Sequence, residues 1–139
     1  MAKRKPMNPN IKVLIVDDDV FLLDMYSIKF KESGFSVEIA KNGEDALAKA
    51  KSLNPDIILL DIVMPKMDGF DVLREIKQNN IAPNAVIFIL TNLGQKEDVD
   101  RGLKLGANDY IVKAHFTPSE VVAKVRSFLG PRQSDDFHL

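Results

Sequence analysis

The sequence predicts a single α/β domain built on a doubly wound parallel sheet of five strands, with helices on both faces. Five short apolar runs rich in β-branched residues recur along the chain, and segments with helical spacing of apolar residues separate them. Most of the runs show little alternation of apolar and polar residues, which is expected of strands covered on both faces. The length of 139 residues, 45% of them hydrophobic, suits one domain with a substantial core.

The five apolar runs are the predicted strands. They cover residues 11–16, 36–40, 56–60, 85–90 and 109–112. The third run contains the stretch IILL and stops at Asp61, after which a Met-Pro and an Asp-Gly pair turn the chain. A segment suited to burial therefore delivers a carboxylate to the rim of the predicted sheet.

Each predicted helix carries apolar residues at helical spacing, and most have a start or stop signal. The first runs through Phe21, Leu22, Met25, Ile28 and Phe30 and ends at Ser33-Gly34; the second is capped by Asn42 and ends at Asn54-Pro55; the third carries Phe70, Leu73 and Ile76. The fourth carries Val99 and Leu103 and ends at Gly106; the fifth carries Val121, Val122, Val125 and Phe128 and ends at Gly130-Pro131. The fifth also opens with Thr117-Pro118-Ser119-Glu120, a capping box with proline at the first helical position.

Composition argues against several classes of protein. A net charge of −1 gives no indication of nucleic-acid binding, and the absence of cysteine excludes disulfides and thiolate metal sites. The chain has no signal-like start and no apolar run of membrane-spanning length, so we expect a soluble, cytoplasmic protein without membrane contact. Residues 1–9, which include Lys3-Arg4-Lys5, and residues 131–139 are predicted to be flexible ends of a domain that spans 10–130.

Residues able to do chemistry follow four of the five strands. Ligands of an open α/β sheet bind outside the carboxyl ends of its strands, so those ends are the place to look. In chain order the residues found there are Asp17, Asp18 and Asp19, then Asp61, then Thr91 and Asn92, then Lys113. Taken singly, Asp19 is explained as a helix cap and the others as turn or loop residues. Together they predict a polar site at one edge of the sheet.

The clustered carboxylates imply a metal ion. At ~5 Å and an effective dielectric constant near 20, each pair of like charges costs about 3 kcal/mol. One ammonium group, that of Lys113, cannot neutralise several carboxylates, so a divalent cation is expected. The candidate ligands are hard oxygens, and His115 and His138 lie away from the strand ends. Mg²⁺ therefore suits the site better than zinc or copper.

Four motifs, VLIVDDD, IILLDIVMPKMDG, ILTN and YIVKA, resemble in order and spacing the receiver domain of two-component response regulators. The resemblance covers roughly residues 10–130. Within this family, the chain is similar to the single-domain chemotaxis regulators. It is specific because the acidic pair, the central Asp, the Thr and the Lys fall at the ends of strands one, three, four and five. It implies the flavodoxin-like (βα)5 fold with strand order 2-1-3-4-5.

The resemblance also implies the role of each site residue. Asp61 is expected to be the phosphoacceptor, which takes a phosphoryl group from a phosphohistidine of a sensor histidine kinase or phosphotransfer protein, or from a small acyl phosphate. Lys113 and Thr91 are expected to assist the transfer of the phosphoryl group to Asp61. Asp18, Asp61 and the backbone carbonyl of Val63 would bind Mg²⁺ directly, and Asp17 through a water molecule. Such a protein is no conventional enzyme, because it catalyses only its own phosphorylation and dephosphorylation.

Signal output is expected to use Thr91 and Tyr110. In the family, the threonine hydroxyl moves toward the phosphoryl group and the tyrosine ring follows, which remodels the surface of the fourth helix, fifth strand and fifth helix. The alternative for Tyr110 is a half-buried strand aromatic without such a role. Because nine residues follow Gly130, we expect a stand-alone receiver whose output passes to a protein partner.

Two positions depart from the family pattern. The residue after Lys113 is commonly a proline with a cis peptide bond, whereas this chain has Ala114. A cis bond at a non-proline residue costs roughly 3–4 kcal/mol, so the loop either keeps that strain or follows a trans path that shifts Lys113. After Thr91 the family usually has a small residue, whereas this chain has Asn92, which could alter water access to the phosphoryl group.

Three other functions place different requirements on the same positions. A phosphohydrolase of the haloacid dehalogenase type needs a second acid two residues after the nucleophile, where this chain has Val63. A flavin-binding flavodoxin needs a Ser/Thr/Gly-rich phosphate loop after the first strand, where Asp17, Asp18 and Asp19 would instead repel phosphate. The third alternative is a pseudo-receiver, a protein-binding module with the same fold and no phosphorylation, for which Ala114 is the main argument.

Overall fold

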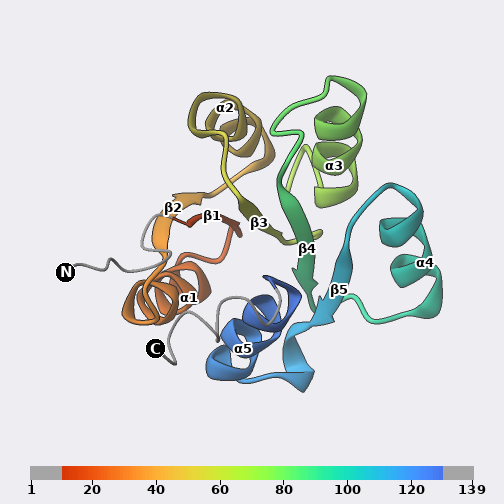
Figure 1. Ribbon diagram of the computed structural model, residues 1–139. Coiled ribbons are helices and arrows are strands. Elements are labelled where there is room, and N and C mark those ends of the chain that lie inside the picture. The colour runs from red at the N-terminus through yellow and green to blue at the C-terminus, as the bar shows by residue number, and fades with distance from the viewer. Residues whose placement is uncertain (1–10, 130–139) are drawn as a thin grey trace.

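The structure is a computed structural model in which residues 11–129 are described (Figure 1). Strands and helices alternate along this part of the chain. The strands are β1 (Lys12–Val16), β2 (Ser36–Ala40), β3 (Ile57–Leu60), β4 (Val86–Thr91) and β5 (Asp109–Val112). The helices are α1 (Val20–Glu32), α2 (Gly43–Leu53), α3 (Gly69–Gln78), α4 (Lys96–Lys104) and α5 (Pro118–Leu129), with a short 3₁₀ helix η1 (Lys113–His115) before α5.

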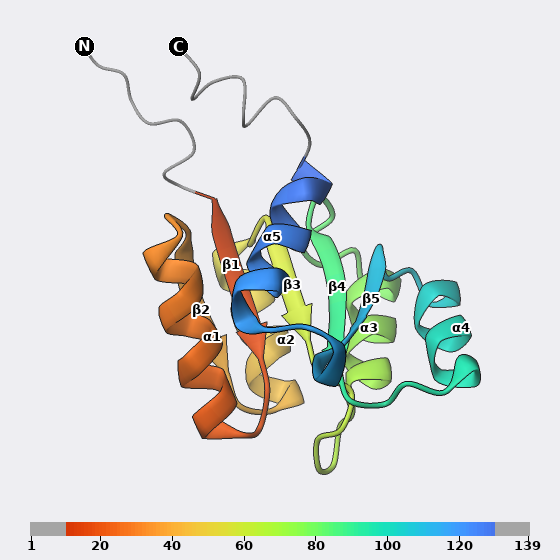
Figure 2. The same ribbon diagram turned by 90° about the horizontal axis from the view of Figure 1, so that it is seen from below.

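The five strands form one parallel sheet in the order β2-β1-β3-β4-β5, which confirms the expected fold class and strand order. Neighbouring strands end almost level with one another. Val16 pairs with Leu60 across β1 and β3, and Thr91 pairs with Val112 across β4 and β5. The residues that follow β1, β3, β4 and β5 therefore emerge side by side at one edge of the sheet, the lower edge in Figure 2.

The core has two parts, one on each face of the sheet. Alternate residues of a strand point to opposite faces, so Leu14 packs with α2 and α3 while Ile15 packs with α1 and α5. Figure 1 shows these two pairs of helices on opposite sides of the strands. All four residues of β3 are at most 1% exposed, as expected of a central strand covered on both faces. This buried strand is a rigid support for the residue that follows it, Asp61.

The predicted helix caps are confirmed. The side chain of Asp19 accepts hydrogen bonds at the start of α1, and that of Asn42 does so at the start of α2. Thr117 and Glu120 form the reciprocal capping box of α5. A second capping box, Asp68 with Asp71 at the start of α3, was not predicted, because Asp68-Gly69 was interpreted as a turn.

Element boundaries differ from the prediction by a residue or so. β1, β3 and β4 begin one residue later than expected, and β4 continues through Thr91, which was placed after the strand. The helix η1 was not predicted. Both predicted flexible ends lie outside the described residues. Within 11–129, no helix combines the length and the apolar character needed to cross a membrane.

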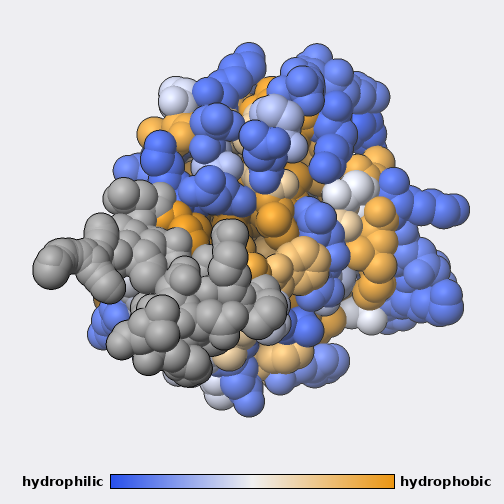
Figure 3. All heavy atoms as spheres, in the orientation of Figure 1, coloured by the Kyte–Doolittle hydropathy of each residue, from blue (hydrophilic) through white to orange (hydrophobic). Residues whose placement is uncertain are grey.

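Surface chemistry follows the layers. Figure 3, in the orientation of Figure 1, shows hydrophilic residues over the outer surfaces of the helices and hydrophobic residues gathered between them toward the sheet. Among residues 11–129, six large apolar residues are nevertheless well exposed: Val20, Phe21, Ile28, Val63, Leu103 and Phe128. Val20, Phe21 and Val63 lie just after the strands β1 and β3, near the edge that carries the acidic residues.

Candidate functional site

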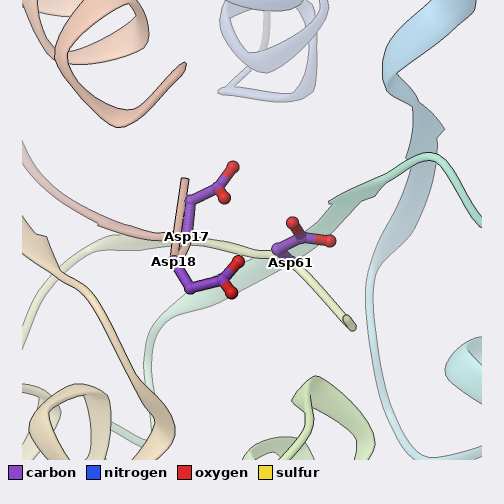
Figure 4. Close-up of side chains that lie close together, drawn as sticks. All are labelled: Asp17, Asp18 and Asp61. Carbon is purple, nitrogen blue, oxygen red and sulfur yellow. The ribbon is translucent and has the colours of Figure 1, made fainter. Parts of the chain in front are cut away.

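Three carboxylates meet at the ends of β1 and β3. Asp17 and Asp18 follow β1, and Asp61 follows β3, its neighbour in the sheet. Each offers an oxygen within 4.8 Å of the oxygens of the other two, and Figure 4 shows the three side chains close together where the two strands end. Asp17 and Asp61 are 2% and 6% exposed, whereas Asp18 is exposed to solvent. The sequence prediction that these acids converge is therefore confirmed.

Lys113 reaches the same cluster from the end of β5. Its Nζ atom lies 2.7 Å from Oδ2 of Asp17 and 2.9 Å from Oδ2 of Asp61, and its side chain is 8% exposed. No peptide bond among residues 11–129 is cis, so the bond between Lys113 and Ala114 is trans. The trans path does not remove Lys113 from the site, and its ammonium forms ion pairs with both Asp17 and Asp61.

Burial and the neighbouring charges together shift the pKa values of Asp17 and Lys113. Burial raises the pKa of Asp17 above its ordinary value, and the nearby charge of Asp61 adds to this, against the opposing effects of Lys113 and the Asp19 N–H. Burial alone would lower the pKa of Lys113, but its hydrogen bond to Asp17 and the charge of Asp61 outweigh burial and raise it. One ammonium is thus held charged by two carboxylates, while each carboxylate has only a share of one cation.

Backbone groups fix the orientation of Asp61. Its Oδ1 atom accepts the N–H of Ile62 at 2.7 Å and that of Val63 at 3.4 Å, while Oδ2 accepts from Lys113. The start of α3 folds back on this loop, because the N–H of Gly69 donates to the carbonyl of Ile62 at 2.9 Å. A Cβ atom at Gly69 would overlap the backbone oxygen of Asp61 and lie 2.8 Å from the Cα of Ile62. Glycine is therefore required there by close approach of two backbones.

Thr91 lies on β4 and Tyr110 on β5, the two strands on the side of β3 away from β1. Thr91 is fully buried at the end of β4, and its Oγ1 accepts the N–H of Leu93 at 3.4 Å. Tyr110 is half-buried, and its hydroxyl donates to the carbonyl of Leu93 at 2.6 Å. Burial raises the pKa of Tyr110 to about 12. Both residues thus bind the loop between β4 and α4, whereas their roles in switching stay predictions.

Three features of the site were missed by sequence reasoning. Asn92 accepts the N–H of Ala114 at 3.0 Å, which joins the loops after β4 and β5. The packing of Gly69 against Asp61 was also missed, although an Asp-Gly pair before a helical segment was a signal for it. The third is the exposure of Val63, whose side chain is 58% exposed. Its backbone carbonyl as a metal ligand stays a prediction.

The donor set fits a divalent oxygen-binding cation. Three carboxylates and one ammonium leave two negative charges when all are ionised, which a divalent ion neutralises. All three carboxylates offer hard oxygen atoms within reach of a common point, and Mg²⁺ and Ca²⁺ prefer such ligands. Neither histidine nor cysteine belongs to the cluster among the residues described, so a zinc or copper site is disfavoured.

Sequence comparison identifies relatives over most of the chain. Residues 13–126 match the family described as the response regulator receiver domain. Over 120 residues the chain is 38% identical to the alkaline phosphatase synthesis transcriptional regulatory protein PhoP of Bacillus subtilis, which covers 86% of this chain and 49% of that protein. The chain spans about half the length of the curated relatives it matches.

Structural comparison gives the same result. A CheY-like response regulator receiver domain protein from Methanospirillum hungatei superposes with a TM-score of 0.79 at 29% identity, covering 90% of this chain and 97% of that one. A chain from the CheX-CheY-BeF3-Mg²⁺ complex of Borrelia burgdorferi also gives 0.79, at 36% identity, and covers 86% of this chain and 90% of that one.

Proposed function

Since this chain belongs to the response regulator receiver domain family, we propose that it is a signalling phosphoacceptor whose acceptor residue is Asp61. The observation that supports this most strongly is the buried pairing of Asp61 with Lys113 beside Asp17, at the rim of the sheet. A carboxylate held in this way is fixed in orientation at the rim of the sheet, with the ammonium of Lys113 beside it. These are the requirements for a nucleophile in phosphoryl transfer.

The proposed reaction is a single displacement at phosphorus. A carboxylate oxygen of Asp61 forms the new O–P bond while the bond from phosphorus to the donor breaks. When the donor is a phosphohistidine, the imidazole nitrogen leaves with the electron pair and is then neutral or takes a proton from water; when it is an acyl phosphate, a carboxylate leaves. No general base is needed, because the attacking oxygen carries no proton.

The residues around Asp61 have separate tasks in this reaction. Lys113, already bound to Oδ2 of Asp61, offers its ammonium to the oxygens of the incoming phosphoryl group. The N–H groups of Ile62 and Val63 hold the carboxylate in a fixed orientation. Asp17, Asp18 and Asp61 would hold Mg²⁺, together with the Val63 carbonyl. When bound, Mg²⁺ supplies positive charge that offsets the charge of the phosphoryl oxygens.

Partners follow from the same proposal. The donor would be a sensor histidine kinase or phosphotransfer protein, and the chain would catalyse only its own phosphorylation and dephosphorylation. Output from a stand-alone receiver of residues 10–130 would go to a protein that binds the surface of α4, β5 and α5, which carries Tyr110 and the exposed Leu103. The proposed coupling is a shift of Thr91 toward the phosphoryl group, followed by Tyr110.

A pseudo-receiver remains the second candidate, because Ala114 replaces the usual proline. The position of Lys113 favours the active receiver, since its ammonium binds both carboxylates through a trans peptide path. The two candidates differ in one measurable property, the ability to take up a phosphoryl group.

Intact-mass spectrometry after incubation with a small acyl phosphate and Mg²⁺ separates these candidates. The native chain should gain one phosphoryl group within minutes to hours. The adduct should be absent with Asp61→Asn and with EDTA in place of Mg²⁺. A native chain that stays unmodified at every time point, under a quench that preserves acyl phosphates, would establish the pseudo-receiver instead.

A further inference from the structure

A side chain joins the two loops that carry Thr91 and Lys113. Asn92 directly follows Thr91, and its Oδ1 atom accepts the backbone N–H of Ala114, which directly follows Lys113, at 3.0 Å. The ladder between β4 and β5 ends with the pair Thr91 and Val112. The bond from Asn92 therefore continues the connection between these strands beyond the last paired residues.

The N–H that Asn92 binds belongs to a turn with little support of its own. Ala114 lies in η1, a 3₁₀ helix of three residues whose preceding residue, Val112, provides no side-chain cap. The first N–H groups of a helix have no acceptor within the helix. One internal bond, from the N–H of Phe116 to the carbonyl of Lys113, closes the turn. Asn92 thus supplies, from the loop that follows β4, the acceptor that the start of this turn lacks.

The turn determines where the side chain of Lys113 begins. A lysine has four side-chain torsions and loses much entropy when its ammonium is fixed. Here the ammonium must stay 2.7 Å from Asp17 and 2.9 Å from Asp61 at the same time. A small displacement of the Lys113 backbone would therefore lengthen at least one of these two contacts.

We propose that Asn92 is a positioning residue, whose side-chain carbonyl holds the turn at Lys113 and thereby keeps the lysine ammonium between Asp17 and Asp61. The part of this inference that concerns reaction rate rests on the proposed function, whereas the part that concerns the position of Lys113 does not. Asn92 is itself exposed and is not a catalytic residue. Its effect on phosphorylation passes through Lys113.

The position of Lys113 is tested directly by lysine labelling. Native protein and Asn92→Leu, which keeps the side-chain size but removes the acceptor, are treated with an amine-reactive ester, and each lysine is quantified by peptide mapping. Loss of one hydrogen bond of ordinary strength corresponds to roughly a three- to tenfold change in an equilibrium. The labelling rate of Lys113, 8% exposed in the native protein, should rise by about that factor.

Two controls separate positioning from a general loss of structure. Lys124 on α5, which pairs with Asp109, should keep its native labelling rate in the same digest. Asn79→Leu, which removes another exposed asparagine bond at the far end of α3, should leave Lys113 unchanged. Equal labelling of Lys113 in the native protein and in Asn92→Leu would overturn the inference, as would a matching rise at Lys124.

A second arm measures function. In Asn92→Leu, the rate of phosphorylation by a small acyl phosphate at saturating Mg²⁺ should fall roughly three- to tenfold. An unchanged rate would refute the functional part of the inference. If even the native chain accepts no phosphoryl group, the proposed function fails, and the labelling arm still decides whether Asn92 positions Lys113.

Discussion

The carboxyl group of Asp17 is buried and shares the ammonium of Lys113 with Asp61. This arrangement leaves the metal-free site with more negative than positive charge, which destabilises the folded protein but prepares the site for a cation. Stability and function therefore oppose each other at these residues. The consequences can be measured one residue at a time.

Stabilisation by Mg²⁺ should depend on pH through Asp17. Its pKa in the folded, metal-free protein is raised by burial, so its contribution to stability falls as the pH rises from the ordinary carboxyl value through the raised value. Metal binding favours the ionised form, so the increase in melting temperature caused by Mg²⁺ should shrink as the pH is lowered from neutrality toward the ordinary carboxyl pKa. Thermal unfolding at a series of pH values, with and without Mg²⁺, measures this, and Asp17→Asn should flatten the dependence. An increase that is constant over the whole range would contradict the assignment.

Asp18 gives a cleaner test of charge crowding, because it is exposed and forms no ion pair with Lys113. Asp18→Asn should stabilise the metal-free protein by about 0.5 kcal/mol, the scale of exposed charge interactions. The same variant should lose most of the stabilisation by Mg²⁺, which for the native protein is about 2.7 kcal/mol when the ion is present at about 100 times its Kd. Chemical denaturation with and without Mg²⁺ measures both effects. Asp24, an exposed acid on α1, serves as the control. Asp24→Asn should neither stabilise the metal-free protein in this way nor lose the stabilisation by Mg²⁺.

Gly69 is the residue whose substitution should damage the site most without touching a charge. Its alanine variant would overlap the backbone oxygen of Asp61, so either α3 or the Asp61 loop must move. We expect a loss of at least about 2 kcal/mol in the free energy of unfolding, the usual scale of overpacking, and slower phosphorylation. Gly94→Ala is the matched control, since its Cβ would meet Val112 at an ordinary 3.5 Å. Equal stability of the two variants in urea denaturation would refute the close approach.

Among the five helices, α4 has the weakest internal support. Its first residue follows Gln95, which makes no side-chain cap bond, and Gly102 is its buried residue. A Cβ atom at Gly102 would lie 2.5 Å from Ile89 and 3.2 Å from the ring of Tyr110. The glycine thus weakens the helix, by about 1 kcal/mol relative to alanine in an open helix, but leaves room for Tyr110. This combination places an uncapped helix with one buried residue next to the residue proposed to carry the signal.

Hydrogen exchange should reflect this difference between helices. The backbone amides of α4 should exchange faster than those of α1 and α3, which bury four and five residues and have side-chain caps. Native-state exchange followed by mass spectrometry at peptide resolution measures the order. Protection of α4 equal to that of α3 would show that the helix is held by contacts other than those described above.

Most of the fold could be predicted from the sequence because its signals are local and repeated. The strands are apolar runs, and the caps at Asp19, Asn42 and Thr117 are short-range hydrogen bonds. Convergence of Asp17, Asp61 and Lys113 followed once their strands were parallel members of one sheet, since the carboxyl ends of such strands lie at the same edge. The proximity of these three residues could thus be predicted from the sequence, whereas their roles rest on the family resemblance and stay predictions.

The other features of the fold and the site could not be predicted from the sequence, because they depend on how loops pass one another in space. The bond between Asn92 and Ala114 joins residues 22 positions apart through a side chain and a backbone group, and no periodicity encodes it. The approach of Gly69 to Asp61 likewise depends on the path of the loop between β3 and α3. The departures from the family pattern at Asn92 and Ala114 were visible in the sequence, whereas their contact was not.

At the scale of the whole molecule, residues 11–129 pack around one parallel sheet, and the cluster of Asp17, Asp18 and Asp61 lies at one edge of that sheet. Both core layers meet at β3, and the helices on either face hold the strand whose end carries Asp61. Because the chain spans about half the length of its curated relatives, the output of the full signalling protein is a proposal, and the absence of a nucleic-acid partner stays a prediction. The proposed function requires of the domain itself that it accept the phosphoryl group at Asp61.

The most direct test of that claim is to identify the phosphorylated residue. Native protein is treated with a small acyl phosphate and Mg²⁺, the adduct is reduced with borohydride, which converts an aspartyl phosphate to homoserine, and the peptides are sequenced by mass spectrometry. We expect homoserine at position 61 and at neither position 17 nor position 18. Homoserine at position 17 or 18, or at none of the three while another residue carries the phosphoryl group, would contradict it.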